Sequence, residues 1–199
     1  MCFGELLVDS FIEHVVARSV SVSTDEHLSV MAGHKVSATL GIFVHSLDSE
    51  ITTVIDLEGY ALKEPTNTVQ TSTGSWLVGN STDDKDLHCI YELTADGHNL
   101  DKYGGQCDSG DGQLNRPYHL ALTDDGKQIL VAYCDNYRVV ILDRQPMRLK
   151  RVLLETGGKP FWLYFMRPTD ATRRLIVSDG HWVWVYESND IFGNQLHHK

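Results

Sequence analysis

The chain has 199 residues, of which 42% are hydrophobic, and a formal net charge of −10 at pH 7. This length bounds it to one domain or to one part of a larger domain. Its apolar runs never reach the roughly 18 residues that cross a membrane, and no basic segment followed by an apolar core opens the chain, as a secretory signal would. We therefore expect a cytoplasmic protein with no membrane partner.

The charge is unevenly distributed along the chain. Residues 1–100 contain 4 basic and 15 acidic residues, a balance of −11, whereas residues 101–199 contain 13 basic and 12 acidic residues, a balance of +1. Proteins bind nucleic acids largely through basic contacts with phosphates, so the net charge disfavours RNA as a partner. The densest basic run predicts either a local basic patch or the charged edge of an outer strand; it consists of Arg144, Arg148, Lys150 and Arg151.

The first part of the chain allows two interpretations. Glu5, Asp9 and Glu13 recur every four residues, which suits one face of a helix. Residues 5–22 are therefore expected to form either a short helix or a strand that precedes the first repeat. Residues 1–17 are left outside the predicted repeats.

Four apolar cores follow in chain order and resemble one another. Each contains a valine at the same position, and the valines are separated by 48, 53 and 46 residues: Val30, Val78, Val131 and Val177. A turn precedes each core and a second apolar run follows it, so each unit predicts an antiparallel meander of short strands. A period of about 40 to 50 residues is typical of β-propeller blades. A β-sandwich, which also has many short strands, is the alternative.

The predicted fold class is therefore all-β, with the whole chain forming a single β-propeller region. Its antiparallel units are expected to span residues 18–48, 66–98, 115–155 and 159–190. Trp182, Trp184 and Tyr186 alternate in the last unit, so they share one face of a strand, and we expect them in the core between blades.

The third unit contains the most specific motif, within residues 104–142. A glycine-rich loop leads to Leu114-Asn115-Arg116-Pro117 and an apolar run, followed by Asp124-Asp125-Gly126, Val131-Ala132 and Asn136-Tyr137-Arg138-Val139. This order resembles an NHL repeat, the blade unit found in the C-terminal region of tripartite-motif (TRIM-NHL) ubiquitin ligases and related scaffold proteins. Tyr133 stands where that family usually has an aspartate after Val-Ala.

The resemblance implies part of a six-bladed propeller that binds a protein partner, as the substrate-recognition module of a ubiquitin-ligase protein. Some relatives bind RNA instead, and related propellers are metal-dependent enzymes of the lactonase or lyase type. Four units do not close a six-bladed ring. The chain is therefore expected to be a fragment of a longer protein, or else to self-associate through its open propeller edges.

No catalytic residue, metal site or cofactor is expected from the sequence. The four cysteines form no Cys-x-x-Cys pair, which argues against a zinc knuckle. The loop Asp108-Ser109-Gly110-Asp111-Gly112 lacks the ligand spacing and the closing glutamate of an EF-hand. His119 is a lone histidine in the strand that would line a propeller channel, and we find no second ligand beside it.

The loops of the third unit are the candidate protein-binding surface, because loops on a rigid scaffold often carry recognition residues. The candidates are Arg116, Tyr118 and His119 at the first strand, and Asn136 and Arg138 at the second turn. The two arginines are able to bind carboxylates in bidentate geometry. Arg138 has an alternative role, in which it braces the neighbouring blade.

Overall fold

The structure is a computed structural model that describes residues 15–22, 28–34, 40–45, 51–57, 59–60, 62, 64–82, 87–105, 114–166 and 174–187. Within this part of the chain, fifteen β-strands form four antiparallel sheets. No described helix is long and apolar enough to cross a membrane. The predicted loop at residues 108–112 and residues 1–14 lie outside the described residues.

Each sheet is a meander in which strands that follow one another in sequence are hydrogen-bonded neighbours. The first sheet contains β1 (Val15–Val22), β2 (Leu28–His34), β3 (Leu40–His45) and β4 (Ile51–Asp56). The second contains β5 (Pro65–Gln70), β6 (Trp76–Asn80), β7 (Cys89–Leu93) and β8 (Asn99–Gly104). The third contains β9 (Pro117–Leu122), β10 (Gln128–Tyr133), β11 (Arg138–Asp143) and β12 (Arg148–Glu155). The fourth contains β13 (Trp162–Met166), β14 (Arg174–Ser178) and β15 (Val183–Glu187).

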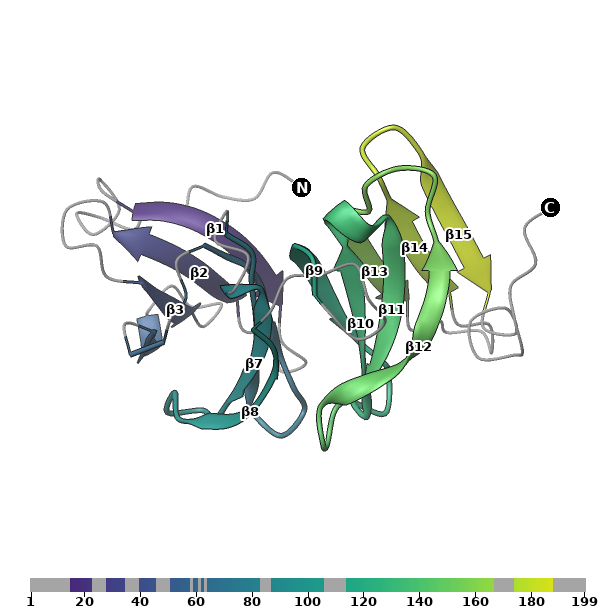
Figure 1. Ribbon diagram of the computed structural model, residues 1–199. Helices are drawn as coiled ribbons and strands as arrows, with labels where there is room; N and C mark the ends of the chain where they lie inside the picture. Colours follow the sequence, from purple (N-terminus) through teal and green to yellow (C-terminus); the bar gives the residue numbers. More distant parts are fainter. Residues whose placement is uncertain are drawn as a thin grey trace.

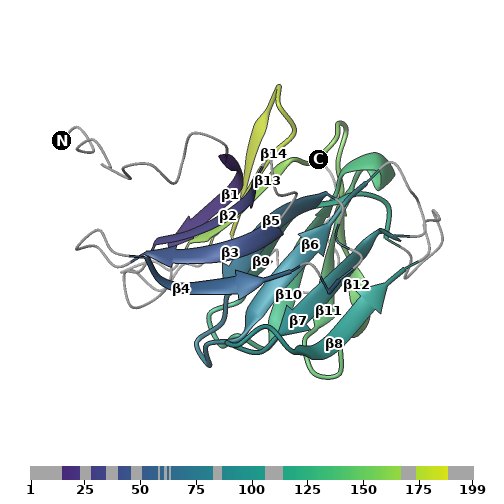
Figure 2. The same ribbon diagram turned by 90° about the vertical axis from the view of Figure 1, so that its left-hand side faces the viewer.

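The four sheets are arranged as blades of a β-propeller, which confirms the predicted fold class (Figure 1). The first strands of successive sheets, β1, β5, β9 and β13, contact one another and therefore form the inner side of the arc. The four repeat valines lie in β2, β6, β10 and β14, the second strand of each sheet. Figure 2 shows the same arc from the side of the first sheet.

The beginning of the described chain is a strand and not a helix. β1 pairs in antiparallel fashion with β2, including Val20 opposite Val30, and so belongs to the first sheet. The helical interpretation of residues 5–22 is therefore wrong for residues 15–22. The acidic spacing that suggests a helix involves residues 5–13, which the structure does not describe.

Three hydrophobic clusters fill the spaces between successive sheets. Because side chains alternate between the two faces of a strand, Trp76 of β6 packs toward the first sheet, whereas the adjacent Leu77 packs toward the third. In β10, Val131 packs toward the second sheet and Leu130 toward the fourth. Inner sheets are thus covered on both faces, which explains why β6 and β7 are buried at every residue.

The tryptophans of the fourth sheet divide between core and surface. Trp184 and Tyr186 pack against the cluster between the third and fourth sheets, as predicted. Trp182 is exposed, because it precedes the first residue of β15 and lies beyond the strand pairing. The expectation of a core position therefore fails for Trp182.

A buried ion pair joins the second and third sheets. Arg144, in the turn after β11, donates from Nε to Glu92 Oε1 of β7 at 3.0 Å. Its other nitrogens donate to Ser75 Oγ at 3.0 Å and to the Gly126 carbonyl oxygen at 3.2 Å. Both charged side chains are at least 90% buried. Arg144 is therefore not part of a surface patch or strand edge, in contrast to the exposed Arg148.

Candidate functional site

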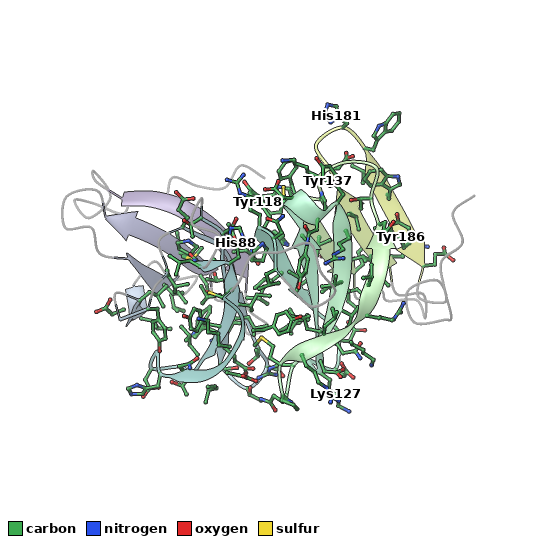
Figure 3. All side chains as sticks on the ribbon, viewed as in Figure 1. His88, Tyr118, Lys127, Tyr137, His181 and Tyr186 are labelled. Atoms are coloured by element: carbon green, nitrogen blue, oxygen red, sulfur yellow. The ribbon has the colours of Figure 1, made fainter. Side chains whose placement is uncertain are left out.

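The main candidate site is a pocket of about 490 Å³ at one end of the inner strands. Three sheets contribute to it where β5, β9 and β13 begin. Its lining residues are Glu64, Pro65, Thr66, Asn67, Ser81, Arg116, Tyr118, His119, Cys134, Lys159, Phe161 and Trp162. Figure 3 shows Tyr118 at this end of the sheets, with Lys127 at the opposite end.

Most of the lining comes from one tetrapeptide pattern, x-Pro-x-x, which occurs once in each of the three sheets. The three tetrapeptides are Glu-Pro-Thr-Asn at residues 64–67, Arg-Pro-Tyr-His at residues 116–119 and Lys-Pro-Phe-Trp at residues 159–162. Proline is tolerated at the first residue of an edge strand because it has no N–H to donate, and β5 and β9 begin at such prolines. The repeat architecture therefore brings equivalent segments to a single place.

The backbone holds the first two tetrapeptides in the same way. The Ser81 amide donates to the Glu64 carbonyl oxygen at 3.0 Å, and the Cys134 amide donates to the Arg116 carbonyl oxygen at 3.0 Å. Thr66 Oγ1 donates to the Pro117 carbonyl oxygen at 2.7 Å, which ties the second sheet directly to the third. These bonds fix the pocket wall formed by β5 and β9.

Aromatic rings form the wall between the third and fourth sheets. Tyr118 and Phe161 meet edge to face, with ring centroids 5.2 Å apart. His119 and Trp162 lie 4.7 Å apart with their planes tilted by 45°. Tyr118 and Trp162 remain partly exposed, so their ring surfaces are accessible to a ligand.

Charged groups at the rim are organised by Asp135, which lies in a short 3₁₀ turn at Cys134–Asn136. Lys159 Nζ donates to Asp135 Oδ1 at 2.6 Å, and Arg116 Nε lies 3.4 Å from Asp135 Oδ2. The hydrogen bond from Lys159 to Asp135 raises the pKa of the lysine ammonium. Both cations are thereby held in fixed positions while about two fifths of each side chain stays exposed.

Arg116 has an unusual backbone conformation, with φ at 52°. Residues other than glycine seldom occupy the left-handed region, and such residues cluster at functional sites when the surroundings hold them in place. Here the Arg116 amide donates to His88 Nδ1 at 3.3 Å, and its carbonyl oxygen accepts from Cys134. This conformation turns the chain sharply where the pocket begins.

His119 lies in the pocket wall with its imidazole largely removed from solvent. Burial lowers its pKa to about 4, so the imidazole is neutral at pH 7. Its Nδ1 atom is buried and has no hydrogen-bond partner in the described part of the structure. Burial also raises the pKa of the Cys134 thiol, which keeps that thiol protonated and unreactive at neutral pH.

The structure brings together three of the five predicted site residues, since Arg116, Tyr118 and His119 line the pocket. Asn136 and Arg138 do not line it. Asn136 Oδ1 accepts a hydrogen bond from Asn115 Nδ2 at 3.0 Å. Arg138 is buried, with its guanidinium carbon 5.7 Å from the ring centroid of Tyr133, which is the environment expected of a bracing residue.

The sequence interpretation misses the contributions of the second and fourth units. Glu64, Lys159, Phe161 and Trp162 belong to segments without a recognisable motif when each is taken alone. Their signal is the recurrence of x-Pro-x-x at corresponding places in three units. No group of His, Cys, Asp or Glu residues able to hold a metal ion occurs among the residues described.

Comparison with known proteins supports the fold. No protein-family profile matches the chain, and no curated protein matches it by sequence. Among solved structures, the chain resembles an auxiliary nutrient binding protein from Bacteroides ovatus, with a TM-score of 0.59, 14% identity, and coverage of 86% of this chain and 45% of the other.

Two further solved structures show the same likeness. The Cps50 (Swd1) β-propeller domain from Myceliophteria thermophila gives a TM-score of 0.56 and 18% identity, covering 86% of this chain and 53% of the other. A functionally unknown protein from Desulfotomaculum acetoxidans gives 0.55 and 16%, covering 81% and 51%. The chain thus spans about half the length of these proteins, and at such low identity the likeness shows a β-propeller fold alone.

Proposed function

We propose that this chain is a protein-binding module of the β-propeller type, which holds a short segment of a partner protein in the pocket formed by the three tetrapeptides. The observation that carries the proposal is the pocket itself. Three sheets converge on a space of about 490 Å³ that combines exposed aromatic surface with fixed polar groups. Sites of this kind, largely pre-formed and with few oriented polar groups, are typical of ligand recognition.

The lining suits a peptide better than a nucleic acid. Tyrosine, tryptophan and arginine are the residues most often found at the energetic centre of protein interfaces, and Tyr118, Trp162 and Arg116 lie together here. The charges nearly balance, because Arg116 and Lys159 are accompanied by Glu64 and Asp135. A balanced site lacks the excess positive charge that attracts a phosphate backbone, which favours a protein segment over RNA.

A binding role also agrees better with the protonation states than a catalytic role does. With its pKa near 4, His119 is a weak base, and the Cys134 thiol stays protonated. The resemblance of residues 104–142 to NHL repeats supports a further part of the proposal, namely that the captured partner is a substrate of a ubiquitin ligase and the chain belongs to the NHL type.

A selection experiment with random peptides tests the proposal, and it works for any partner sequence. A library of random peptides displayed on phage is selected on the immobilised chain, and the enriched clones are compared on the Trp162→Ala, Tyr118→Ala and Trp182→Ala variants. Trp182 is the matched control, an exposed tryptophan adjoining the same sheet as Trp162 that does not line the pocket.

The proposal predicts clones that bind the wild-type chain and the Trp182→Ala variant but lose binding to the two pocket variants. Truncating an aromatic residue at the centre of an interface costs about 2 kcal/mol or more, a loss of roughly 30-fold in affinity. Clones that bind all variants equally, or depend only on Trp182, would show that the pocket is not the recognition site.

A further inference from the structure

The fourth sheet has one covered face and one open face. In the register of β13, β14 and β15, Leu163, Val177 and Trp184 form one row, and Phe165, Leu175 and Tyr186 form the next row on the same face. All six residues belong to the cluster that packs against the third sheet. This face is therefore the ordinary contact between neighbouring blades.

The opposite face of the same sheet is also apolar but is covered by no described element. Its first row places Tyr164 opposite Ile176, and Ile176 opposite Val185. The second row runs from Trp162 through Ser178 to Val183. Four of these side chains are between 57% and 66% exposed: Val185, Trp162, Tyr164 and Val183. A contiguous exposed apolar face of this kind marks an interaction site.

The first sheet, at the other end of the arc, has the same division. Met31, Ile42 and Ile55 form a buried row that packs toward the second sheet. The adjacent row of the register places Val20 opposite Val30 in β1 and β2, and Val20 is 56% exposed. The two open faces lie at opposite ends of the arc in Figure 1.

We infer that a second copy of this chain covers these faces, with β13–β15 of each copy packed head to tail on β1–β4 of the other. Two copies would supply eight blades, within the usual range of four to eight for closed propellers. The chain spans 45% to 53% of the length of the structurally similar proteins, so two copies together have the length of one of them. A contact between two different faces closes into a two-fold ring when its rotation allows it.

The charge distribution favours this pairing over the alternatives. A head-to-tail contact places the acidic half of the chain, with a balance of −11, against the half with a balance of +1. A head-to-head contact would instead place two acidic halves together, which electrostatic repulsion disfavours. Closure would also surround the pocket with the inner strands of both copies, so the assembly and the proposed binding site share one channel.

Light scattering coupled to size-exclusion chromatography tests the assembly. We expect the wild-type chain to elute at micromolar concentration with twice its 22.4 kDa mass. Val185→Lys and Val20→Lys each place a charge on one open face and should give monomers with at least a tenfold weaker association. Leu100→Lys is the matched control, because Leu100 is similarly exposed, at 54%, but lies on β8, away from both faces; this variant should remain dimeric.

Mixing the two monomeric variants distinguishes the pairing modes. In a head-to-tail assembly, Val185→Lys and Val20→Lys chains retain one unaltered contact between them, so the mixture should form heterodimers. Circular dichroism melting of each variant alone shows that it is folded. A monomeric wild-type chain, a dimer that persists in Val185→Lys, or a mixture that stays monomeric would each overturn the inference.

Discussion

Arg116 and Arg138 belong to the same sheet, yet the fold places them in different environments. Arg116 lies at the pocket rim with an exposed ion pair to Asp135, whereas Arg138 is buried against Tyr133. We expect Arg116→Ala to weaken binding of a selected peptide while leaving the melting temperature nearly unchanged. Arg138→Ala should lower stability by about 1 to 2 kcal/mol, which corresponds to a fall of roughly 2 to 8 °C for a chain of this size.

Thermal melting and peptide titration of both variants measure the two effects separately. The assignment fails if Arg116→Ala melts as early as Arg138→Ala, because Arg116 would then be part of the scaffold. It also fails if neither variant alters peptide binding.

His119 gives the pocket a defined dependence on pH. Burial lowers its pKa from 6.5 to about 4, so between these values the unfolded chain takes up a proton that the folded chain does not. Stability is therefore unaffected by this group above pH 6.5 and falls as the pH decreases from 6.5 to 4. The full loss is about 3 kcal/mol.

Urea unfolding of the wild type and His119→Gln near neutral pH and near pH 4 checks this expectation. The variant lacks the titrating group, so its stability should fall by about 3 kcal/mol less over this range than that of the wild type. His98→Gln, at an exposed histidine, should behave like the wild type. An identical pH dependence in His119→Gln would contradict the neutral, buried state of His119.

At the scale of the elements, the contact between the second and third sheets depends on the ion pair of Arg144 and Glu92. Removing one partner from a buried pair leaves the other charge without compensation, at a cost of about 3 to 5 kcal/mol. Arg144→Ala should therefore reduce the free energy of unfolding by that amount. Arg148→Ala removes an exposed arginine of the same region and should have little effect. Equal urea midpoints for the two variants would show that the pair does not join the sheets.

The elements that the sequence predicts well are the second strands, because alternating burial between two blades leaves a continuous apolar run such as that of β6 and β10. Outer strands are harder to recognise. β8 contains Asn99, Asp101 and Lys102, and most of its residues are wholly or partly exposed, so the apolar pattern disappears there and the predicted second unit ends at residue 98. Alternation places Trp182 with Trp184 in the core, but the pairing of β15 begins one residue after Trp182.

The site is predictable only within the best-formed repeat. Arg116, Tyr118 and His119 adjoin a recognisable motif, whereas Lys159 and Trp162 meet them only after three sheets are packed together. Arg144 shows the same limit from the opposite direction. Its position in a basic run suggests the surface, and its burial follows from Glu92, which lies 52 residues earlier in the chain.

At the scale of the whole molecule, the proposed function depends on the three tetrapeptides acting as a single site. Hydrogen–deuterium exchange of the chain, with and without a peptide selected on it, tests this most directly. We predict simultaneous protection of residues 64–67, 116–119 and 159–162, with no change at the Lys127 end of the sheets. Protection confined to one of the three segments, or located at the Lys127 end, would contradict a single shared site.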